Sequence, residues 1–201
     1  MTKPLLIGLA GALGAGKTSF AQRLIERWGF VAVNHGDAIK DEIATTLRRT
    51  LKAHYRAARP DIRDRDDLGA VSEEQWSDYI RTTLWERRDE FTRALLQEWG
   101  TELRRREDPD YWIHQWEARI QPHLRVVADN VRFPNEAESI RARGGVLVRI
   151  TRHTWEPFAG AHVSETALAE WAEWDFTIKN DGTREDLAAE ADRVARAAGA
   201  V

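Results

Sequence analysis

Short apolar runs alternate along the chain with longer stretches in which apolar residues follow helical spacing. The runs predict buried strands at residues 5–10, 31–33, 124–128, 146–150 and 176–179. The longer stretches predict helices at residues 19–28, 37–51, 72–106, 111–121, 135–143 and from 184 onward. Strands that alternate with helices are typical of a mainly parallel sheet covered by helices. The pattern therefore predicts an α/β fold.

Capping residues and helix breakers set the expected ends of these helices. Single N-caps are predicted at Asp37, Asp110 and Thr183, and capping boxes at Ser72 with Gln75 and at Asn135 with Glu138. The long helical stretch is expected to break near Gly100, and Gly144 ends the helix before the fourth strand.

Two segments contain neither an apolar run nor apolar residues at helical spacing. Residues 54–69 are dense in Arg and Asp, and we expect them to be exposed and irregular. Residues 151–164 are polar and contain Pro157 and Gly160, which predicts a loop or a lid.

The composition narrows the class of protein. The chain has 201 residues, which is enough for one domain with a sizeable core. Its 30 basic and 33 acidic residues give a net charge of −3, so nothing in the balance calls for a nucleic acid or a membrane as partner. The absence of cysteine excludes disulfides and thiolate metal sites. No segment matches a signal peptide or a membrane span, and we expect a soluble, cytoplasmic protein.

The segment Gly11–Thr18 carries the strongest chemical signal. Its sequence GALGAGKT fits the phosphate-binding pattern G-x-x-x-x-G-K-[ST] at every required position. Glycines let successive backbone N–H groups point at phosphate oxygens. Lys17 supplies a positive charge for the β- and γ-phosphates, and the Thr18 hydroxyl can ligate Mg²⁺. A predicted strand precedes the segment and a predicted helix follows it, as this chemistry requires.

A second group of polar residues follows the strand predicted at 124–128. In parallel sheets, ligands bind beyond the carboxyl ends of the strands. Asp129 could hold Mg²⁺ there through water, and Arg132 could grip a phosphate with its planar fork. The alternative is a plain turn with a surface arginine and a capping Asn135, and the spacing alone favours neither.

Three further sites offer cations. Arg93 and Gln97 share a helix face ahead of the basic run 104–106, although a solvated basic helix explains this pattern as well and is favoured on spacing alone. Lys40 lies one turn into the helix that Asp37 is expected to cap, within reach of the sheet edge. Arg152 enters the expected lid, and phosphoryl transfer profits from a cation that arrives when a lid closes.

These motifs together resemble the bacteriophage-type deoxynucleoside monophosphate kinases, a branch of the P-loop nucleoside monophosphate kinases. The resemblance extends from Leu5 to Leu187 and rests on motifs in a fixed order. They are GALGAGKT, the 37–40 element, LLQEWGTELRR, DPDYW, VRFPNEAESIRARGG, HVSE and NDGT. The ordered set is much more specific than the glycine-rich loop alone.

The resemblance implies a single P-loop kinase domain over residues 1–201, with a three-layer α/β/α architecture. It also implies a helical monophosphate-binding part at about residues 38–122 and a lid at about 151–165. The implied activity is ATP-dependent phosphorylation of a deoxynucleoside monophosphate to its diphosphate, with Mg²⁺. The Asn180–Thr183 turn would lie near the adenine.

The resemblance assigns residues as follows. Leu13, Gly14, Ala15, Gly16, Lys17 and Thr18 would hold the ATP phosphates, and Thr18 and Asp129 the metal. Lys40, Arg93, Gly100, Thr101, Trp112, Arg132 and Glu136 match positions of the monophosphate site. Lys17, Arg93, Arg132 and Arg152 would be the catalytic cations.

Some points stay open at this level. Asn130 stands where the family often has an acid, Gly160 replaces another acid, and Ala38 replaces a frequent proline, which leaves the base preference and the metal ligands undecided. The alternatives are a kinase like dephospho-coenzyme A kinase, a nucleotide-dependent ATPase switch, and a binding module without catalysis. The nine tryptophans are expected in the core or in pocket walls, and a homodimer through tryptophan-rich helices is left open.

Overall fold

The computed structural model describes residues 4–46, 73–86, 89–153 and 162–200. The chain divides into two compact units, one formed by Met1–Gly36 with Asp110–Val201 and the other by Asp37–Pro109. Each unit is described below by itself. Within the described residues, no helix has the length and apolar character needed to cross a membrane.

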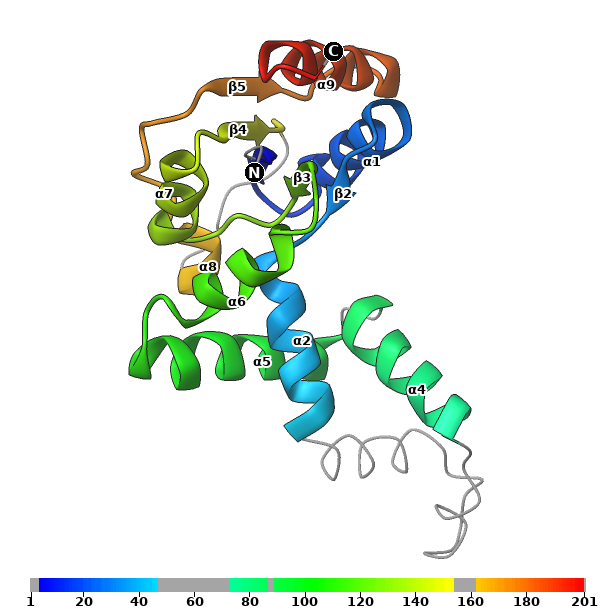
Figure 1. Ribbon diagram of the computed structural model, residues 1–201, viewed down its shortest axis with the longest axis vertical. Coiled ribbons are helices and arrows are strands. Elements are labelled where there is room, and N and C mark those ends of the chain that lie inside the picture. Colours follow the sequence, from blue (N-terminus) through cyan, green and yellow to red (C-terminus); the bar gives the residue numbers. More distant parts are fainter. Residues whose placement is uncertain (1–3, 47–72, 87–88, 154–161, 201) are drawn as a thin grey trace, which may run out of the picture. The chain divides into compact units, whose positions relative to one another are not determined.

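The first unit contains a five-stranded sheet with the order β2-β3-β1-β4-β5 (Figure 1). The strands are β1 (Leu5–Ala10), β2 (Val31–Ala32), β3 (Arg125–Ala128), β4 (Val146–Thr151) and β5 (Phe176–Lys179). Every pairing is parallel. The predicted α/β fold with a mainly parallel sheet is therefore confirmed. The sequence pattern could predict it because strands buried on both faces form near-continuous apolar runs.

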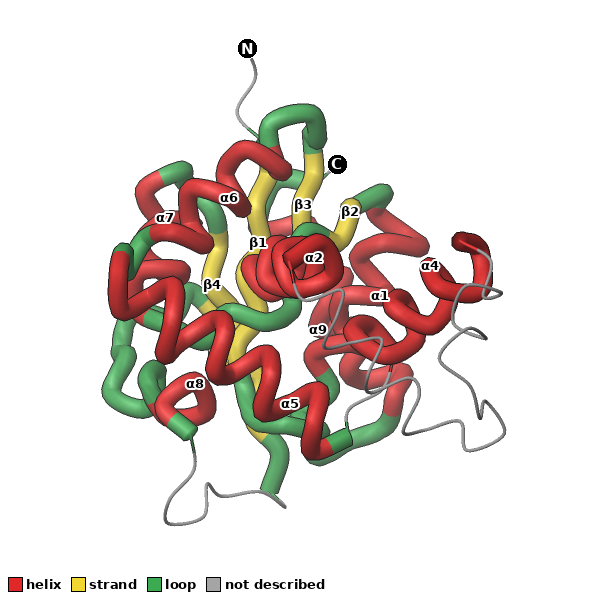
Figure 2. The backbone as a smooth tube through the Cα atoms, turned by 90° about the horizontal axis from the view of Figure 1, so that it is seen from below, coloured by secondary structure: helices red, strands yellow, loops and turns green. Residues whose placement is uncertain are grey.

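Helices cover both faces of this sheet, which gives the three-layer α/β/α arrangement of a P-loop kinase fold. Helices α1 (Lys17–Trp28) and α9 (Arg184–Ala197) lie on one face, and α6 (Tyr111–Ile120) and α7 (Pro134–Ala142) on the other (Figure 2). Successive β1 side chains point to opposite faces. Ile7 and Leu9 accordingly pack beneath α1 and α9, whereas Leu6 and Ala10 pack with residues of α6 and α7.

The N-terminus of α7 differs from the prediction. The helix begins at Pro134, whose fixed φ suits the first helical position. The Oε2 atom of Glu136 accepts hydrogen bonds from the backbone N–H groups of Arg132 (2.8 Å) and Phe133 (3.3 Å). The expected capping pair of Asn135 with Glu138 is therefore wrong, because the proline moves the N-cap to Phe133.

Asn135 and Asp110 bind each other instead. The Nδ2 atom of Asn135 donates to Oδ1 of Asp110 over 2.8 Å, and Asp110 makes no side-chain capping bond at the start of α6. The cap predicted at Thr183 is confirmed, since Thr183 Oγ1 accepts a hydrogen bond from the backbone N–H of Asp186 over 3.1 Å.

The second unit is helical. Its elements are the greater part of α2 (His35–Thr46), α4 (Glu73–Arg81), the π-helical segment η2 (Thr82–Glu86), α5 (Glu90–Gln97) and the π-helical segment η3 (Glu98–Arg105). Helix α2 begins at His35, so Asp37 lies in its first turn rather than at the expected N-cap. Ser72 and segment 54–69 lie outside the described residues.

Gly100 does not break the helical run as predicted. It lies inside η3, and a Cβ atom there would come within 2.8 Å of the Ile39 Cδ1 atom. The glycine therefore allows η3 to approach α2 closely. Ile43, Trp76 and Leu84 form the core of this unit, with Trp85 and Trp99 packed against them.

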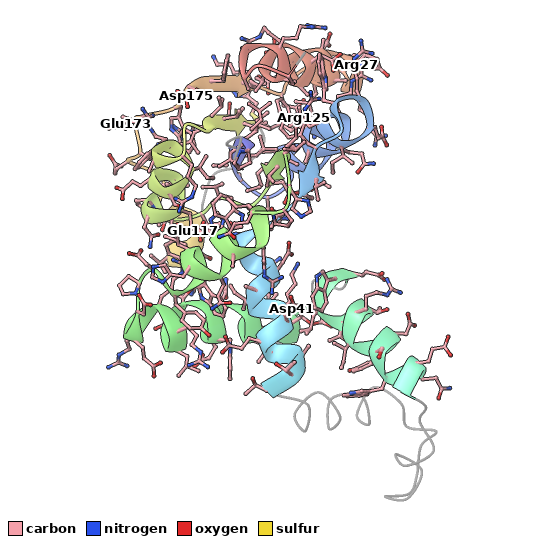
Figure 3. The ribbon with its side chains drawn as sticks, in the orientation of Figure 1. Arg27, Asp41, Glu117, Arg125, Glu173 and Asp175 are labelled. Atoms are coloured by element: carbon pink, nitrogen blue, oxygen red, sulfur yellow. The ribbon has the colours of Figure 1, made fainter. Side chains whose placement is uncertain are left out.

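An ionic cluster joins α1 to α9 in the first unit. Asp192 accepts hydrogen bonds from Nε (2.9 Å) and Nη2 (2.8 Å) of Arg23 and from Nε1 of Trp28 (2.8 Å). Nε of Arg27, the residue labelled in Figure 3, lies 3.4 Å from Oδ2 of Asp192. The side chain of Asp192 is 10% exposed. The hydrogen bonds from Arg23 lower the pKa of Asp192 to about 2, against the opposing effect of burial.

Asp192→Asn is expected to reduce the free energy of unfolding by roughly 2 kcal/mol near pH 7, because the charge-assisted bonds to Arg23 are lost. The folded-state pKa lies below the ordinary value of 3.8, so this stabilisation is complete above that value and disappears as the pH falls from about 4 to about 2. Urea unfolding at several pH values measures the difference. Glu190→Gln, in an exposed pair with Arg193 on α9, is the control. A pH-independent difference between Asp192→Asn and the wild type would contradict the assignment.

Candidate functional site

The loop Gly11–Thr18 connects β1 to α1 in a conformation that depends on its glycines. Gly14 and Gly16 have φ values of +78° and +105°, which L side chains rarely adopt. A Cβ atom at Gly16 would lie 2.4 Å from Asn180 Nδ2, and one at Gly11 would lie 2.1 Å from the carbonyl oxygen of Ile150. The loop enters the N-terminus of α1, where no acidic residue occupies the first turn. This geometry suits a bound anion.

Lys17 folds its side chain back along the loop. Its Nζ donates to the carbonyl oxygens of Gly11 (2.6 Å) and Ala12 (2.7 Å). The ammonium group is therefore held beside the loop backbone, where it can exchange carbonyl oxygens for phosphate oxygens without moving far.

Asn180 supports the same loop from the C-terminal part of the chain. Its Nδ2 donates to the carbonyl oxygen of Ala15 over 2.8 Å, and its backbone N–H donates to Thr151 over 2.8 Å. The Asn side chain is buried. Sequence analysis found a turn here, but the support of the loop by Asn180 has no local signal, because the two segments lie 165 positions apart.

A cavity of about 200 Å³ opens beside the loop. Its charged lining residues are Lys17, Arg132, Arg149, Arg152 and Glu165. Four cations thus face one carboxylate, a balance that attracts polyanions. The volume is below the roughly 300–1,000 Å³ of typical small-molecule pockets, so the cavity suits the phosphate groups of a nucleotide rather than a whole nucleotide.

Arg132 forms the principal ion pair of this cavity. Its Nη1 lies 2.6 Å from Glu165 Oε1 and 3.4 Å from the Ser164 carbonyl oxygen. The Glu136 carboxylate, which is 2% exposed, binds the backbone N–H of Arg132 and so fixes where this arginine leaves the chain. Glu136 therefore positions Arg132 in this structure, and its direct contact with a substrate stays a prediction.

The short helix α8 (Val163–Thr166) carries Glu165. His162 Nδ1 accepts a hydrogen bond from the Ser164 backbone N–H over 3.2 Å and so caps the helix. The HVSE motif thereby places its carboxylate against Arg132. Much of the expected lid, residues 154–161, lies outside the described residues.

The candidate metal ligands are oxygen atoms at two places in the first unit. Thr18 is exposed in the first turn of α1, and Asp129 is half-buried just past β3, with its backbone N–H bound to Asn34 Oδ1 at 2.7 Å. In the described ranges, no three His, Cys, Asp or Glu side chains gather into a metal site of their own. Asn130 Oδ1 is buried and has no hydrogen-bond partner among the described residues, which leaves one oxygen acceptor unused beside Asp129. Hydroxyl, carboxylate and amide oxygens are ligand types that Mg²⁺ accepts, and it takes few protein ligands together with phosphate and water oxygens.

Four predicted substrate residues lie in the second unit. Lys40 Nζ lies 3.3 Å from Asp37 Oδ1 and 5.5 Å from the centre of the Trp85 ring. Arg93 is exposed on α5, and Gly100 and Thr101 lie on η3.

Two more predictions concern Trp112 and the basic run 104–106, which belong to different units. Trp112, which belongs to the first unit, is fully buried on α6. Arg104 of the basic run is bound to Glu42, with Nε 2.6 Å from Oε1, and therefore has a structural role.

Sequence analysis did not single out Arg149. The available signal was a charged residue within the apolar run Val146–Ile150. The structure shows that Arg149 lines the cavity.

Comparison with known proteins finds a relative that matches most of the chain. The chain is 28% identical to a protein of Acanthamoeba polyphaga mimivirus named "Putative deoxynucleotide monophosphate kinase", over 91% of this chain and 92% of the relative. No protein-family model matches the chain. Together with the fold, the likeness supports a kinase that uses a nucleotide.

Glu165→Gln is expected to tighten the binding of inorganic phosphate about tenfold, because the carboxylate that competes for Arg132 is removed. Titration followed by ³¹P NMR measures the affinity even in the millimolar range. Glu170→Gln, an exposed residue of the same segment, is the control and should bind phosphate as the wild type does. Unchanged affinity in Glu165→Gln would show that phosphate does not compete for Arg132.

Proposed function

We propose that the protein transfers the γ-phosphoryl group of ATP to a deoxynucleoside monophosphate and forms the diphosphate. The observation that carries this proposal is the cavity in which the Lys17 loop faces three arginines and one carboxylate. A site of this kind neutralises two polyanions at once, which is the main task of a phosphoryl-transfer enzyme. The name of the mimivirus relative, at 28% identity, supports the same activity.

The donor side is built by the Gly11–Thr18 loop. Its backbone N–H groups and Lys17 would bind the β- and γ-phosphates, with Leu13, Gly14, Ala15 and Gly16 forming the cradle. Thr18 and Asp129 would hold Mg²⁺, which screens phosphate charge when it is bound. Lys17 would exchange its bonds to Gly11 and Ala12 for bonds to phosphate, so its position needs little rearrangement.

The acceptor side is built around Arg132, whose fork would hold the monophosphate in line with the donor. For this, Arg132 must leave Glu165, and a doubly charged phosphate competes well for a guanidinium against a single carboxylate. Arg152, exposed just past β4, would cover the transferring group as the lid closes and water is excluded. No general base is needed, because the attacking phosphate oxygen is already anionic near pH 7.

The resemblance adds Lys40, Arg93, Gly100, Thr101 and Trp112 to the acceptor site. In this proposal Arg93 contributes a second guanidinium to the monophosphate, and its exposure on α5 leaves the side chain available. Trp112 is a candidate wall for the base, although the structure shows it fully buried.

The deciding experiment is an acceptor panel. ATP and Mg²⁺ are combined with each deoxynucleoside and nucleoside monophosphate and with dephospho-coenzyme A, and the products are separated by chromatography. A deoxynucleoside diphosphate is the expected product. Lys17→Met should reduce its formation by a factor of about 1,000 or more, because a cation at the transferring phosphate is lost. ATP hydrolysis without a phosphorylated acceptor would instead identify an ATPase, and phosphorylation of dephospho-coenzyme A alone would identify a different kinase.

Arg132→Met is expected to raise the KM of the monophosphate about tenfold or more and to leave the KM of ATP within about twofold, because this arginine serves the acceptor. Steady-state kinetics with each substrate varied in turn separates the two effects. Arg141→Met is a matched control, since both side chains are about two-fifths exposed (38% and 40%) and each pairs with one glutamate. A loss confined to ATP would move Arg132 to the donor side.

A further inference from the structure

Arg149 occupies an unusual position on the central sheet. Side chains alternate along β4, and Leu147 on the same face as Arg149 is fully buried in the apolar layer beneath α6 and α7. Arg149 follows two positions later and is itself half-buried. Removing a guanidinium from water is unfavourable unless an anion compensates for it.

The protein provides no such anion among the described residues. Arg149 has no hydrogen bond or ion pair within that part of the chain. Two other half-buried arginines of the first unit do have carboxylate partners: Arg23 pairs with Asp192 and Arg143 with Glu117, over 2.8 Å and 2.6 Å. Arg149 is thus a half-buried cation without a carboxylate partner, and three further cations line the same cavity. Such an arrangement favours the binding of an anionic ligand.

The strand register places Arg149 beside the Gly11–Thr18 loop. Arg149 pairs with Ala10, the residue immediately before the loop, and the next residue, Ile150, approaches Gly11 so closely that a Cβ would not fit. Arg149 is therefore carried by a hydrogen-bonded strand and lines the same cavity as Lys17, whereas Arg152 is exposed beyond the strand end. The strand reduces the freedom that Arg149 must lose when it binds a ligand.

The face of the sheet indicates which phosphate Arg149 serves. The cavity is also lined by Leu168 and Trp174, which pack on the layer of α6 and α7. Asn180 supports the loop at Ala15, and Ala15 belongs to the opposite layer, that of α1 and α9. Arg149 thus lies with Arg132, on the side away from the Asn180 turn.

We propose that Arg149 is a phosphate-binding residue that holds the acceptor phosphate together with Arg132. The assignment to the acceptor rests on the proposed kinase function, whereas the binding of phosphate by Arg149 does not. Arg149 can bind the phosphate without first breaking an ion pair among the described residues, whereas Arg132 must first separate from Glu165.

The first experiment requires no turnover. Binding of inorganic phosphate, followed by ³¹P NMR, should weaken about tenfold or more in Arg149→Met and by a smaller factor in Arg149→Lys, which keeps the charge but loses the fork. Arg125→Met is the control, since Arg125 is also a strand arginine but donates to the Trp28 carbonyl oxygen and does not line the cavity. Circular dichroism establishes that each variant is folded. If Arg149→Met fails to fold, Arg149→Lys carries the test.

The second experiment assigns the phosphate. With the acceptor found in the panel, Arg149→Met should raise the acceptor KM about tenfold and leave the KM of ATP within about twofold. Wild-type phosphate affinity in Arg149→Met would overturn the proposal, and an effect on ATP alone would overturn the acceptor assignment. Should the wild type phosphorylate nothing in the panel, the kinase function fails, but the phosphate titration still decides the role of Arg149.

Discussion

The close approach of the Gly11–Thr18 loop to its neighbours is the constraint on which the rest of the site depends. Gly11 lies against the backbone of β4, and Gly16 lies against Asn180, with no room for a Cβ at either position. These contacts bind the loop to segments that come much later in the chain. The parallel sheet makes this possible because the carboxyl ends of β1, β3 and β4 all meet at the same edge. Because these strand ends lie together, Lys17, Arg132 and Arg149 line one cavity.

The charges of this cavity are balanced only in part by the protein. Glu165 compensates for Arg132, and the loop carbonyl oxygens hold Lys17. Arg149 and Arg152 have no carboxylate among the described residues. The cluster around Asp192 is different. There, two arginines and a tryptophan surround one carboxylate, and their contacts join α1 to α9. The same residue type therefore joins two helices at one place, whereas at the other its charge has no carboxylate partner among the described residues.

Local patterns predicted most of the fold because they depend on neighbours in the chain. All five strands lie where apolar runs predicted them, and Thr183 caps α9 as expected. The errors occur where a different local rule or a tertiary contact was stronger. Pro134 moved the start of α7, so Glu136 rather than Glu138 binds the backbone there. Gly100 serves the contact with Ile39 and does not end the helix.

By itself, the sequence determined the glycine-rich loop, the order of strands and helices, and the candidate roles of Lys17, Thr18 and Arg132. Each of these follows from residues close together in the chain. Only the tertiary structure decided that Glu165 binds Arg132, that Asn180 supports the loop and that Arg149 enters the cavity. These contacts join segments from different parts of the sheet and its surroundings. Strand order and register bring them together, and neither leaves a signal in the spacing of residues along the chain.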